Sequence, residues 1–222
     1  RRRRLTIAQV VALGTSLMAL LLLLLVRTDV WEQWQATVRD DAPNRFIVNV
    51  QPDQRTTFDG VLARLGFESA GLSPMIVARY VGPSAQERGR PAPQGRGARL
   101  ADREFNLSTA DTLPAGNTLA AGTFWDPATV RNEFSVETGF AEELRWQLGD
   151  TIAFDVAGQR IEGRITSLRD VRWESFTPNF FVLASPDMAA ALPATYITAV
   201  KVPPGDASLA TALAREIPNA NV

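Results

Sequence analysis

Apolar residues are concentrated near the start of the chain. Arg1 to Arg4 are followed by 22 residues, Leu5 to Val26, without one ionisable side chain. At 1.5 Å per residue, a helix of this length extends about 33 Å, enough to cross a hydrocarbon core of roughly 30 Å. The pattern predicts a transmembrane helix at residues 5–26. Because basic residues stay on the cytoplasmic side, we expect residues 1–4 in the cytoplasm and the residues after the helix outside, in a bacterial periplasm.

A cleaved signal peptide is the competing interpretation of this apolar run. Its hydrophobic core normally has about 7–15 residues and ends at a cleavage site made of small residues. Here Val26 is followed by Arg27, Thr28 and Asp29, and the run is longer. We therefore expect a helix that is retained in the mature protein.

Small residues recur along one face of the predicted helix. Ala8, Ala12, Ser16 and Ala19 are spaced by four, four and three residues. Such stripes let a second membrane helix approach closely, so they predict packing against further transmembrane helices; a lone anchor with incidental alanines is the alternative. No Asp, Glu, Lys or Arg lies within residues 5–26, which argues against an ion path.

The next segment, residues 27–42, continues the helical pattern. Trp31, Trp34 and Val38 form a narrow apolar stripe, and Pro43 ends it. We expect a stalk helix that extends from the membrane. The same tryptophans also suit an aromatic belt at the membrane surface, and both interpretations hold if the helix continues outward.

A strand–helix–strand unit is predicted next. Residues 46–50 and 75–81 are β-branched and strand-like, and the helix between them has apolar residues at 58, 61, 62 and 65. Asp53 is its expected N-cap, and Gly66 is expected to close it. We expect the second strand beside the first. A strand at 196–202 and a helix through Leu209, Leu213 and Ile217 repeat this pattern, so residues 43–82 and 194–222 are predicted to form an α/β lobe.

Residues 83–100 are rich in Gly and Pro and contain Arg88, Arg90, Arg96 and Arg99. We interpret them as a flexible, solvated loop. The alternative is a segment that contacts anionic headgroups or a partner.

Residues 101–193 have mainly strand-like patterns. The clearest is a hairpin in which Ile152, Phe154 and Val156 alternate, Gly158 turns, and alternation resumes from Ile161 to Ile165. Strands are also predicted at 104–107, 171–174 and 179–183, and a short helix within residues 135–148. The overall prediction is an α+β protein, with this β-rich lobe inserted into the α/β lobe.

Composition removes many enzyme classes. The chain has no Cys and no His, which excludes disulfides, thiol nucleophiles and Ser-His triads. A phosphate-binding Gly-rich loop is absent. Residues 27–222 carry 19 basic and 24 acidic residues, a net charge of −5, so nucleic acid is not an expected partner.

The remaining candidates for chemistry are weak. Glu142 and Glu143 are adjacent on a predicted helix and point apart, and Asp40 and Asp41 suit a solvated helix end. Lys201, the single lysine, has no nucleophile motif near it. We therefore expect no catalytic, cofactor-binding or metal-binding residues and no enzymatic activity in this segment.

Several fragments resemble a known family. They run from Ser135 through the L-G-D-T and T-S-L-R fragments to Trp173–Phe181, whose W-x-S-F-x-P-N-F-F pattern is the most specific. Together with the order of the predicted elements, they resemble FtsX-like, MacB-like ABC transporter permeases, closest to the YbbP branch. The family-motif residues in this sequence are Gly149, Asp150, Trp173, Pro178, Asn179 and Phe180.

The resemblance implies a fragment of a permease subunit in the bacterial inner membrane. Its ectodomain would comprise a split, porter-like lobe and a sabre-like inserted lobe. A cytoplasmic ABC ATPase would supply the energy, and movement would pass along the stalk through Trp31, Trp34 and Val38 (mechanotransmission) to export or extract a hydrophobic or lipid-like substrate. Further membrane helices of the same or a second permease, membrane lipid and a periplasmic lipase or thioesterase are the other implied partners.

Two other classes of function remain open from the residues alone. One is a single-span, membrane-anchored periplasmic scaffold or adaptor that binds a protein partner. The other is a carboxylate-based hydrolase of the cell envelope, because 24 acidic residues always include some close pair. The chain begins with Arg rather than Met, and we expect it to be a segment of a longer protein.

Overall fold

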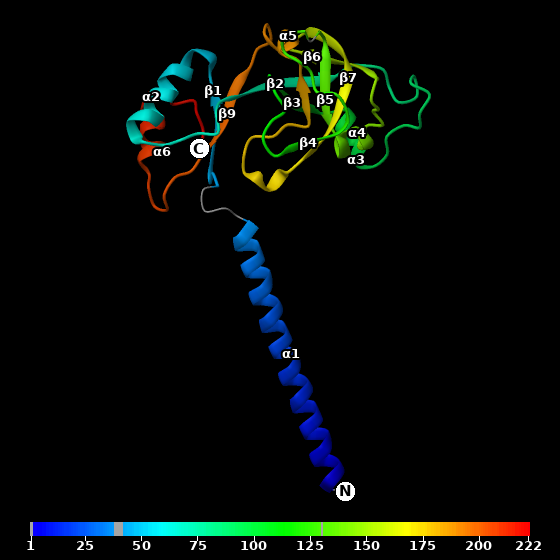
Figure 1. Ribbon diagram of the computed structural model, residues 1–222, viewed down its shortest axis with the longest axis vertical. Coiled ribbons are helices and arrows are strands. Elements are labelled where there is room, and N and C mark those ends of the chain that lie inside the picture. Colours follow the sequence, from blue (N-terminus) through cyan, green and yellow to red (C-terminus); the bar gives the residue numbers. More distant parts are fainter. Residues whose placement is uncertain (1, 38–41, 130) are drawn as a thin grey trace. The chain divides into compact units, whose positions relative to one another are not determined.

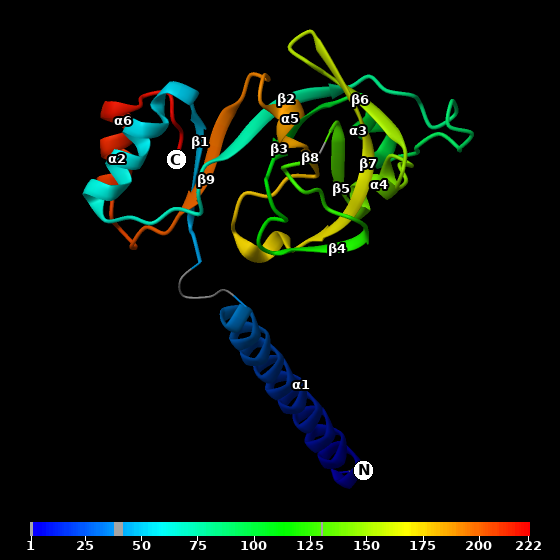
Figure 2. The ribbon, with the colours of Figure 1, turned by 45° about the horizontal axis from the view of Figure 1, so that its top comes forward.

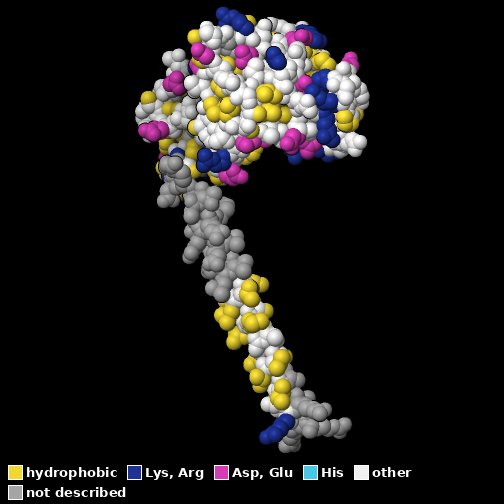
Figure 3. Space-filling view, turned by 45° about the vertical axis from the view of Figure 1, so that its right-hand side comes forward, with side chains coloured by type: hydrophobic (Ala, Val, Ile, Leu, Met, Phe, Trp, Pro, Cys, Tyr) yellow, Lys and Arg dark blue, Asp and Glu magenta, His cyan; other side chains and the backbone are white. Residues whose placement is uncertain are grey.

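The computed structural model describes residues 2–37, 42–129 and 131–222, in two compact units, Arg1–Ala42 and Pro43–Val222 (Figure 1). In the first unit, helix α1 covers Arg2–Thr37. Its apolar side chains from Ile7 to Leu24 are exposed where they are described (Figure 3). Among the described residues, no helix combines the length and apolarity that a membrane span requires.

The second unit is an α+β fold, as the sequence predicts. Its strands are β1 (Arg45–Val50), β2 (Ser73–Tyr80), β3 (Glu104–Thr109), β4 (Asn117–Gly122), β5 (Glu133–Glu137), β6 (Thr151–Val156), β7 (Gln159–Val171), β8 (Val182–Ala184) and β9 (Thr195–Val200). Its helices are α2 (Arg55–Leu65), α3 (Arg96–Ala101), α4 (Thr138–Glu143), α5 (Pro186–Ala189) and α6 (Ser208–Glu216), with the short 3₁₀ turns η1 (Pro52–Gln54) and η2 (Trp173–Ser175).

The strands form one continuous sheet in the order β1-β9-β2-β3-β8-β5-β7-β4. Strand β6 pairs with both β7 and β2, so the part of the sheet from β2 to β7 closes on itself. Strands β1 and β9 extend this closed sheet to one side (Figure 2).

The prediction that the second strand lies beside the first is wrong. Strand β9 is inserted between β1 and β2 and runs antiparallel to both. Strands β1 and β2 are therefore parallel, joined through α2, with one strand between them. This is a split β-α-β arrangement. Strand β9 begins about 120 residues after the start of β2, and a local sequence pattern cannot show between which strands such a distant segment is inserted.

A first hydrophobic core lies between α2, α6 and the β1–β9 pair (Figures 1 and 2). Phe58 and Val61 of α2 and Leu213 of α6 are fully or almost fully buried there, as the helical spacing predicts. Gly66 ends α2 with φ 73°. Asp53, however, is not the N-cap: it lies inside η1, where Gln54 Oε1 accepts the backbone N–H of Gln51 at 3.1 Å.

A second, aromatic core fills the closed sheet. Phe154 of β6 is buried at its centre and makes edge contacts with Phe105, Phe134 and Trp146 at ring-centroid distances of 5.2–6.0 Å. Such pairs contribute beyond their buried area. The β6–β7 hairpin is confirmed, with Ala157 and Gly158 forming its two-residue turn at φ 52° and 85°.

Three predicted elements differ from the structure, one being the strand expected at 179–183, which begins only at Val182 as β8. The helix expected within residues 135–148 covers only α4, because residues 135–137 instead pair with β7 and β8 in strand β5. Leu148 lies beyond the helix and is exposed. The strand expected at 171–174 ends at Val171, where the chain enters η2.

Residues 83–100 are less solvated than the sequence suggests. They contain α3, and the side chains of Arg88 and Arg90 are only 10% and 22% exposed. Arg90 donates through both terminal nitrogens to the Asp150 carboxylate, at 2.9 Å for the Nη2–Oδ1 contact. Arg88 donates to the Tyr80 hydroxyl at 2.7 Å, and its Nε lies 3.7 Å from Asp150 Oδ2. Gly and Pro mark the turns of this segment, but ion pairs hold it against the closed sheet.

Asp150 is stabilised in its charged form. Burial by itself would raise the pKa of its carboxyl, but hydrogen bonds from Arg90 and from the Gln147 backbone N–H outweigh burial. The charges of Arg90 and Arg88 act in the same direction. The net pKa is lowered, so the ionised carboxylate stabilises the folded state.

The Asp150→Asn variant tests this contact. An amide accepts hydrogen bonds but carries no charge, so the free energy of unfolding at pH 7 should fall by about 1–3 kcal/mol. Because the folded-state pKa is lowered, the difference from wild type is present above the unfolded-state pKa, about 4. It should shrink as the pH falls from there through the folded-state pKa. Urea unfolding across this range measures both effects.

The exposed Asp170→Asn change is the control for Asp150 and should leave the free energy of unfolding at pH 7 close to that of wild type. A pH-independent loss in Asp150→Asn would contradict the ionic role of Asp150.

Two glycines give predictions of opposite sign. A Cβ at Gly163 in β7 would lie 2.4 Å from the Asn132 carbonyl oxygen, whereas a Cβ at Gly60 in α2 meets nothing within 4 Å. Gly163→Ala should therefore destabilise the protein by about 1–3 kcal/mol through overpacking. Gly60→Ala should stabilise it by about 0.5–1 kcal/mol, because Ala is favoured within a helix. Chemical unfolding measures the free energy of unfolding of both variants. Equal changes in the two variants would contradict both predictions.

Candidate functional site

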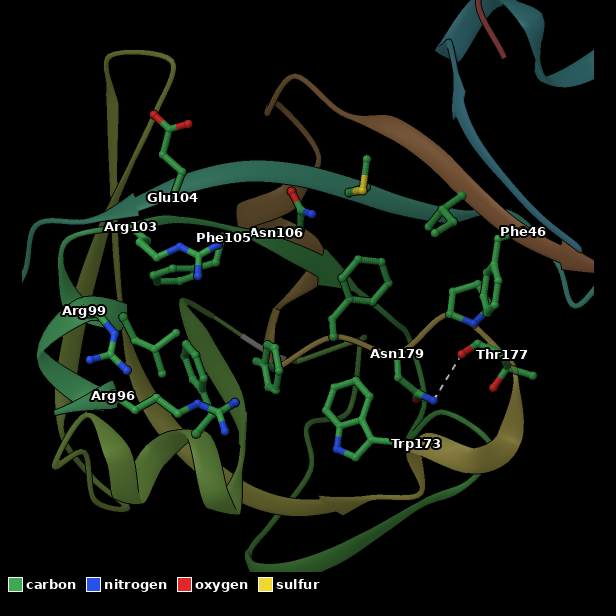
Figure 4. Close-up of a pocket in the computed structure, with 17 residues that line it drawn as sticks. Phe46, Arg96, Arg99, Arg103, Glu104, Phe105, Asn106, Trp173, Thr177 and Asn179 are labelled. Carbon is green, nitrogen blue, oxygen red and sulfur yellow. Dashed lines mark hydrogen bonds between the residues drawn. The ribbon is translucent and has the colours of Figure 1, made fainter. Parts of the chain in front are cut away.

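A cavity of about 760 Å3 lies beside the place where β9 and β2 join the closed sheet. Phe46 of β1, Met75 of β2 and Ile197 of β9 line one side of it. The opposite sides come from α3, α4, β3 and residues 173–181, which we call the motif loop (Figure 4). Segments far apart in the sequence therefore meet at one concave surface.

One wall of this cavity is aromatic. Phe140 stacks on Phe181 at a ring-centroid distance of 4.8 Å and contacts Phe105 edge-on at 5.5 Å. Trp173 lies 4.8 Å from Phe181 and is 45% exposed. Exposed apolar surface in a concavity of this size is typical of a ligand pocket.

The rim of the cavity is basic. Arg96, Arg99 and Arg103 line it on the side of α3, and Glu104 is the acidic residue among its lining residues (Figure 4). Glu104 is engaged by Arg79 at 3.1 Å. Within the described ranges, none of the three rim arginines forms a salt bridge. Their guanidinium groups are therefore available to an anionic group.

A close contact between α3 and α4 sets the position of these arginines. A Cβ at Gly97 would lie 2.1 Å from the Glu143 carbonyl oxygen, so only glycine allows this approach. Because α3 rests directly on the end of α4, Arg96 and Arg99 are carried to the edge of the aromatic wall.

The motif loop is held by side-chain hydrogen bonds. The Asn179 amide donates to Ser175 Oγ at 3.2 Å and to the Thr177 carbonyl at 3.3 Å. Its Oδ1 accepts a hydrogen bond from Asn117 at 3.0 Å. Phe176, at φ 53°, makes the sharp turn within the loop. Asn179 therefore fastens the loop both to itself and to the start of β4.

Arg169 also holds the motif loop in place through hydrogen bonds. Its Nη2 donates to the Phe180 carbonyl at 2.5 Å, and its Nη1 donates to Asn117 Oδ1 at 2.6 Å. The side chain is buried, and burial lowers the pKa of the guanidinium to about 10, while the charge of Glu137 raises it. Arg169 therefore remains a cation at neutral pH.

The structure brings together four of the six family-motif residues. Trp173, Pro178, Asn179 and Phe180 all line the cavity. Gly149 and Asp150 lie elsewhere, in the turn that binds Arg90, where Gly149 adopts φ 89°. The conformation required at Gly149 and the ion pair of Asp150 give these two residues a structural role.

The residues singled out near the N-terminus are described only in part. Ala12, Ser16 and Ala19 lie on α1 with exposed side chains, and the Ser16 hydroxyl donates to the Ala12 carbonyl at 2.8 Å. Val38, Asp40 and Asp41 and the side chains of Ala8, Trp31 and Trp34 lie outside the described part of the chain. Packing by the small residues and coupling by the stalk remain predictions.

Sequence reasoning named Arg96 and Arg99 only within the alternative interpretation of residues 83–100, as a contact for anionic headgroups or a partner, and it missed Arg103 and Arg169. Arg96, Arg99 and Arg103 are spaced by three and four residues, a helical signal that the surrounding Gly and Pro obscured. Arg169 falls in the alternation of buried residues 161, 163, 165 and 167 along β7, but a shift of the β5–β7 register between Ile165 and Ser167 changes the face, which the strand period could not show.

The described acidic residues provide no metal centre. No group of three or more Asp or Glu side chains within these ranges is placed to hold a metal ion. What the described cavity offers is binding chemistry: an aromatic wall for a hydrocarbon group and a basic rim for an anionic group.

No protein-family model matches the chain. The chain is 31% identical over 213 residues to a curated protein named "Uncharacterized ABC transporter permease YbbP" from Escherichia coli strain K12. The match covers 96% of this chain but only 25% of that relative, so the chain spans about a quarter of the relative's length. This similarity confirms the resemblance noted in the sequence, and it relates the chain to the YbbP branch of the ABC transporter permeases.

Proposed function

We propose that this chain is a segment of an ABC transporter permease subunit in the bacterial inner membrane. In this proposal residues 1–4 are cytoplasmic, residues 5–26 cross the membrane, residues 27–42 form a stalk, and the rest is periplasmic. The similarity to a permease supports the family. The run of 22 residues without an ionisable side chain supports the span.

We further propose the FtsX-like, MacB-like organisation of the ectodomain. Residues 43–82 and 194–222 would form the porter-like lobe, residues 101–193 the sabre-like lobe, and residues 83–100 the connection between them. The two separate hydrophobic cores support this division, since one is built from both ends of the ectodomain sequence and the other mainly from its middle.

Coupling to ATP is the proposed source of movement. A cytoplasmic ABC ATPase would bind the permease and drive its membrane helices, and the stalk would carry that movement to the ectodomain. Further membrane helices of the same or a second permease would pack on Ala8, Ala12, Ser16 and Ala19. A periplasmic lipase or thioesterase would act on what the permease delivers. Catalysis of ATP hydrolysis would then belong to the partner subunit.

The cavity carries the proposal for the substrate class. Its aromatic wall suits a hydrocarbon chain, and its three rim arginines suit a negatively charged head. It is lined by residues from both proposed lobes, including Ile197 of β9 and Phe140 of α4. A movement of one lobe against the other would therefore change its shape. A hydrophobic, lipid-like anion is the ligand that this arrangement fits best.

Binding of laurate to the full chain tests the substrate class. In phosphatidylcholine nanodiscs, laurate should displace a fluorescent fatty acid more effectively than dodecanol, which has the same chain length but no charge. Arg99→Gln and Arg103→Gln should each weaken laurate binding by about fivefold, the effect expected of losing one exposed charge contact of about 1 kcal/mol. Neither change should affect dodecanol.

Arg215→Gln is the matched control, since Arg215 is an exposed arginine on α6 away from the cavity. Equal laurate affinities for wild type, Arg99→Gln and Arg103→Gln would show that the rim does not select an anionic head.

The stalk gives a test of coupling. Two or three prolines inserted between Val30 and Val38 should break the helix. In the full-length permease reconstituted with its ATPase, ATP hydrolysis should continue while substrate movement is lost. Assembly of the complex should be unchanged by co-purification.

Alanine insertions of equal length, which preserve a helix, are the control for the proline variants. If substrate movement survives the prolines at the wild-type rate, the stalk is not the coupling element.

A further inference from the structure

Arg169 occupies a position where the rest of its strand is apolar or small. Alternate residues of β7 are buried at Ile161, Gly163, Ile165 and Ser167, and Arg169 follows them with only 1% of its surface exposed. A buried guanidinium is costly unless its charge is compensated. The buried charge of Arg169 therefore requires a compensating group.

The protein satisfies Arg169 only in part. Its two terminal nitrogens donate to Asn117 Oδ1 and to the Phe180 carbonyl, both neutral acceptors. Its Nε has no hydrogen-bond partner among the described residues. Glu137 lies opposite in the β5–β7 register and its charge acts on Arg169, but no salt bridge joins the two side chains. One buried cation thus keeps an unused donor.

A small cavity of about 190 Å3 is lined in part by Arg169. Besides Arg169, it is lined by hydroxyl and amide side chains, including those of Thr109 and Asn117, and by apolar residues such as Phe180 and Leu183. Thr109 Oγ1 is buried and, within the described residues, also lacks a hydrogen-bond partner. None of the described residues that line the cavity is acidic. Arg169, with its unused Nε, and Thr109, with its unused hydroxyl, therefore line one cavity whose described lining contains no acidic side chain.

We propose that this cavity binds a small oxyanion of the phosphate class. Arg169 Nε and Thr109 Oγ1 would both donate to it, one from β7 and the other from the end of β3. Donors that arrive from separate strands suit a tetrahedral anion, which accepts hydrogen bonds in several directions. The anion would also supply the negative charge that Arg169 lacks.

The occupant is either a free phosphate ion or the phosphate headgroup of an amphiphile. Pro178, Asn179 and Phe180 line both this cavity and the larger one, so the motif loop is a shared wall between them. A headgroup would reach Arg169 past this wall, whereas a free ion would need no hydrocarbon binding. The anion site goes beyond the proposed transport function and does not depend on it.

A purely structural role for Arg169 makes a different prediction. In that case its bonds to Asn117 and Phe180 merely hold the motif loop, and the protein binds no phosphate at this place. Thr109 separates the two roles, because no hydrogen bond among the described residues uses its hydroxyl. Thr109→Val keeps the shape of the side chain and leaves both arginine bonds intact.

Calorimetric titration of the full chain in a neutral detergent tests the proposal, with inorganic phosphate at constant ionic strength. Wild type should bind one phosphate saturably. Thr109→Val should weaken binding about tenfold, as expected when a hydrogen bond to a charged group is lost. Arg169→Lys should weaken phosphate binding by at least as much, because lysine has no guanidinium group and therefore lacks the Nε donor. Arg172→Gln, an exposed arginine three residues along the chain, should bind as wild type does.

A parallel titration with octyl phosphate identifies the source. Tighter binding than inorganic phosphate, with the gain lost in Trp173→Ala, assigns the site to a headgroup. Equal affinity assigns it to the free ion. No saturable phosphate binding by wild type, or equal affinity of wild type and Thr109→Val, would overturn the anion site. Neither result bears on laurate binding at the rim arginines, so the two proposals fail independently.

Discussion

The fold of residues 43–222 depends on strand β2, because different parts of this strand pair with different neighbours. Its first residues, Ser73 to Met75, pair with β9, and its later residues pair with β3 and β6. One strand therefore belongs to the α/β layer at one end and to the closed sheet at the other. The backbone of β2 connects the regions of the two hydrophobic cores, while each core keeps its own set of buried residues.

The larger cavity follows from this arrangement. It is lined near the point where β2 passes from one core to the other, with Met75 on its surface. The motif loop covers the remaining side, and it keeps its shape because Asn179 and Arg169 bind its backbone and side chains from within the fold. A concave apolar surface is thus maintained by polar contacts that lie behind it, which is how binding sites are commonly supported.

Much of the secondary structure could be predicted from the sequence, because period and turn chemistry are local. The β6–β7 hairpin shows strict alternation around Ala157-Gly158, and α6 shows Leu209 and Leu213 four residues apart. Pairing partners could not be predicted, since the position of β9 between β1 and β2 depends on tertiary contacts. The candidate site could be predicted only in part. The motif loop was recognised in the sequence, but the helical pattern of α3 was obscured by the Gly and Pro around it. The position of α3 depends on the close approach of Gly97 to Glu143, which is a tertiary contact. The ion pair between Arg90 and Asp150 joins residues 60 apart, beyond any local pattern.

The place of β9 also has a consequence for the order in which the chain folds. Arg45 pairs with Val200, so the α/β core cannot form until almost all of residues 43–222 are available. The closed sheet uses β2 to β8, a contiguous stretch that ends at Ala184. When the chain is synthesised from its N-terminus, the closed sheet can form first. The apolar faces of β1 and α2 then stay exposed until β9 and α6 are available. The addition of the segment after Ala184 is therefore the last step of folding, and a change that removes β9 leaves β1 without its pairing strand.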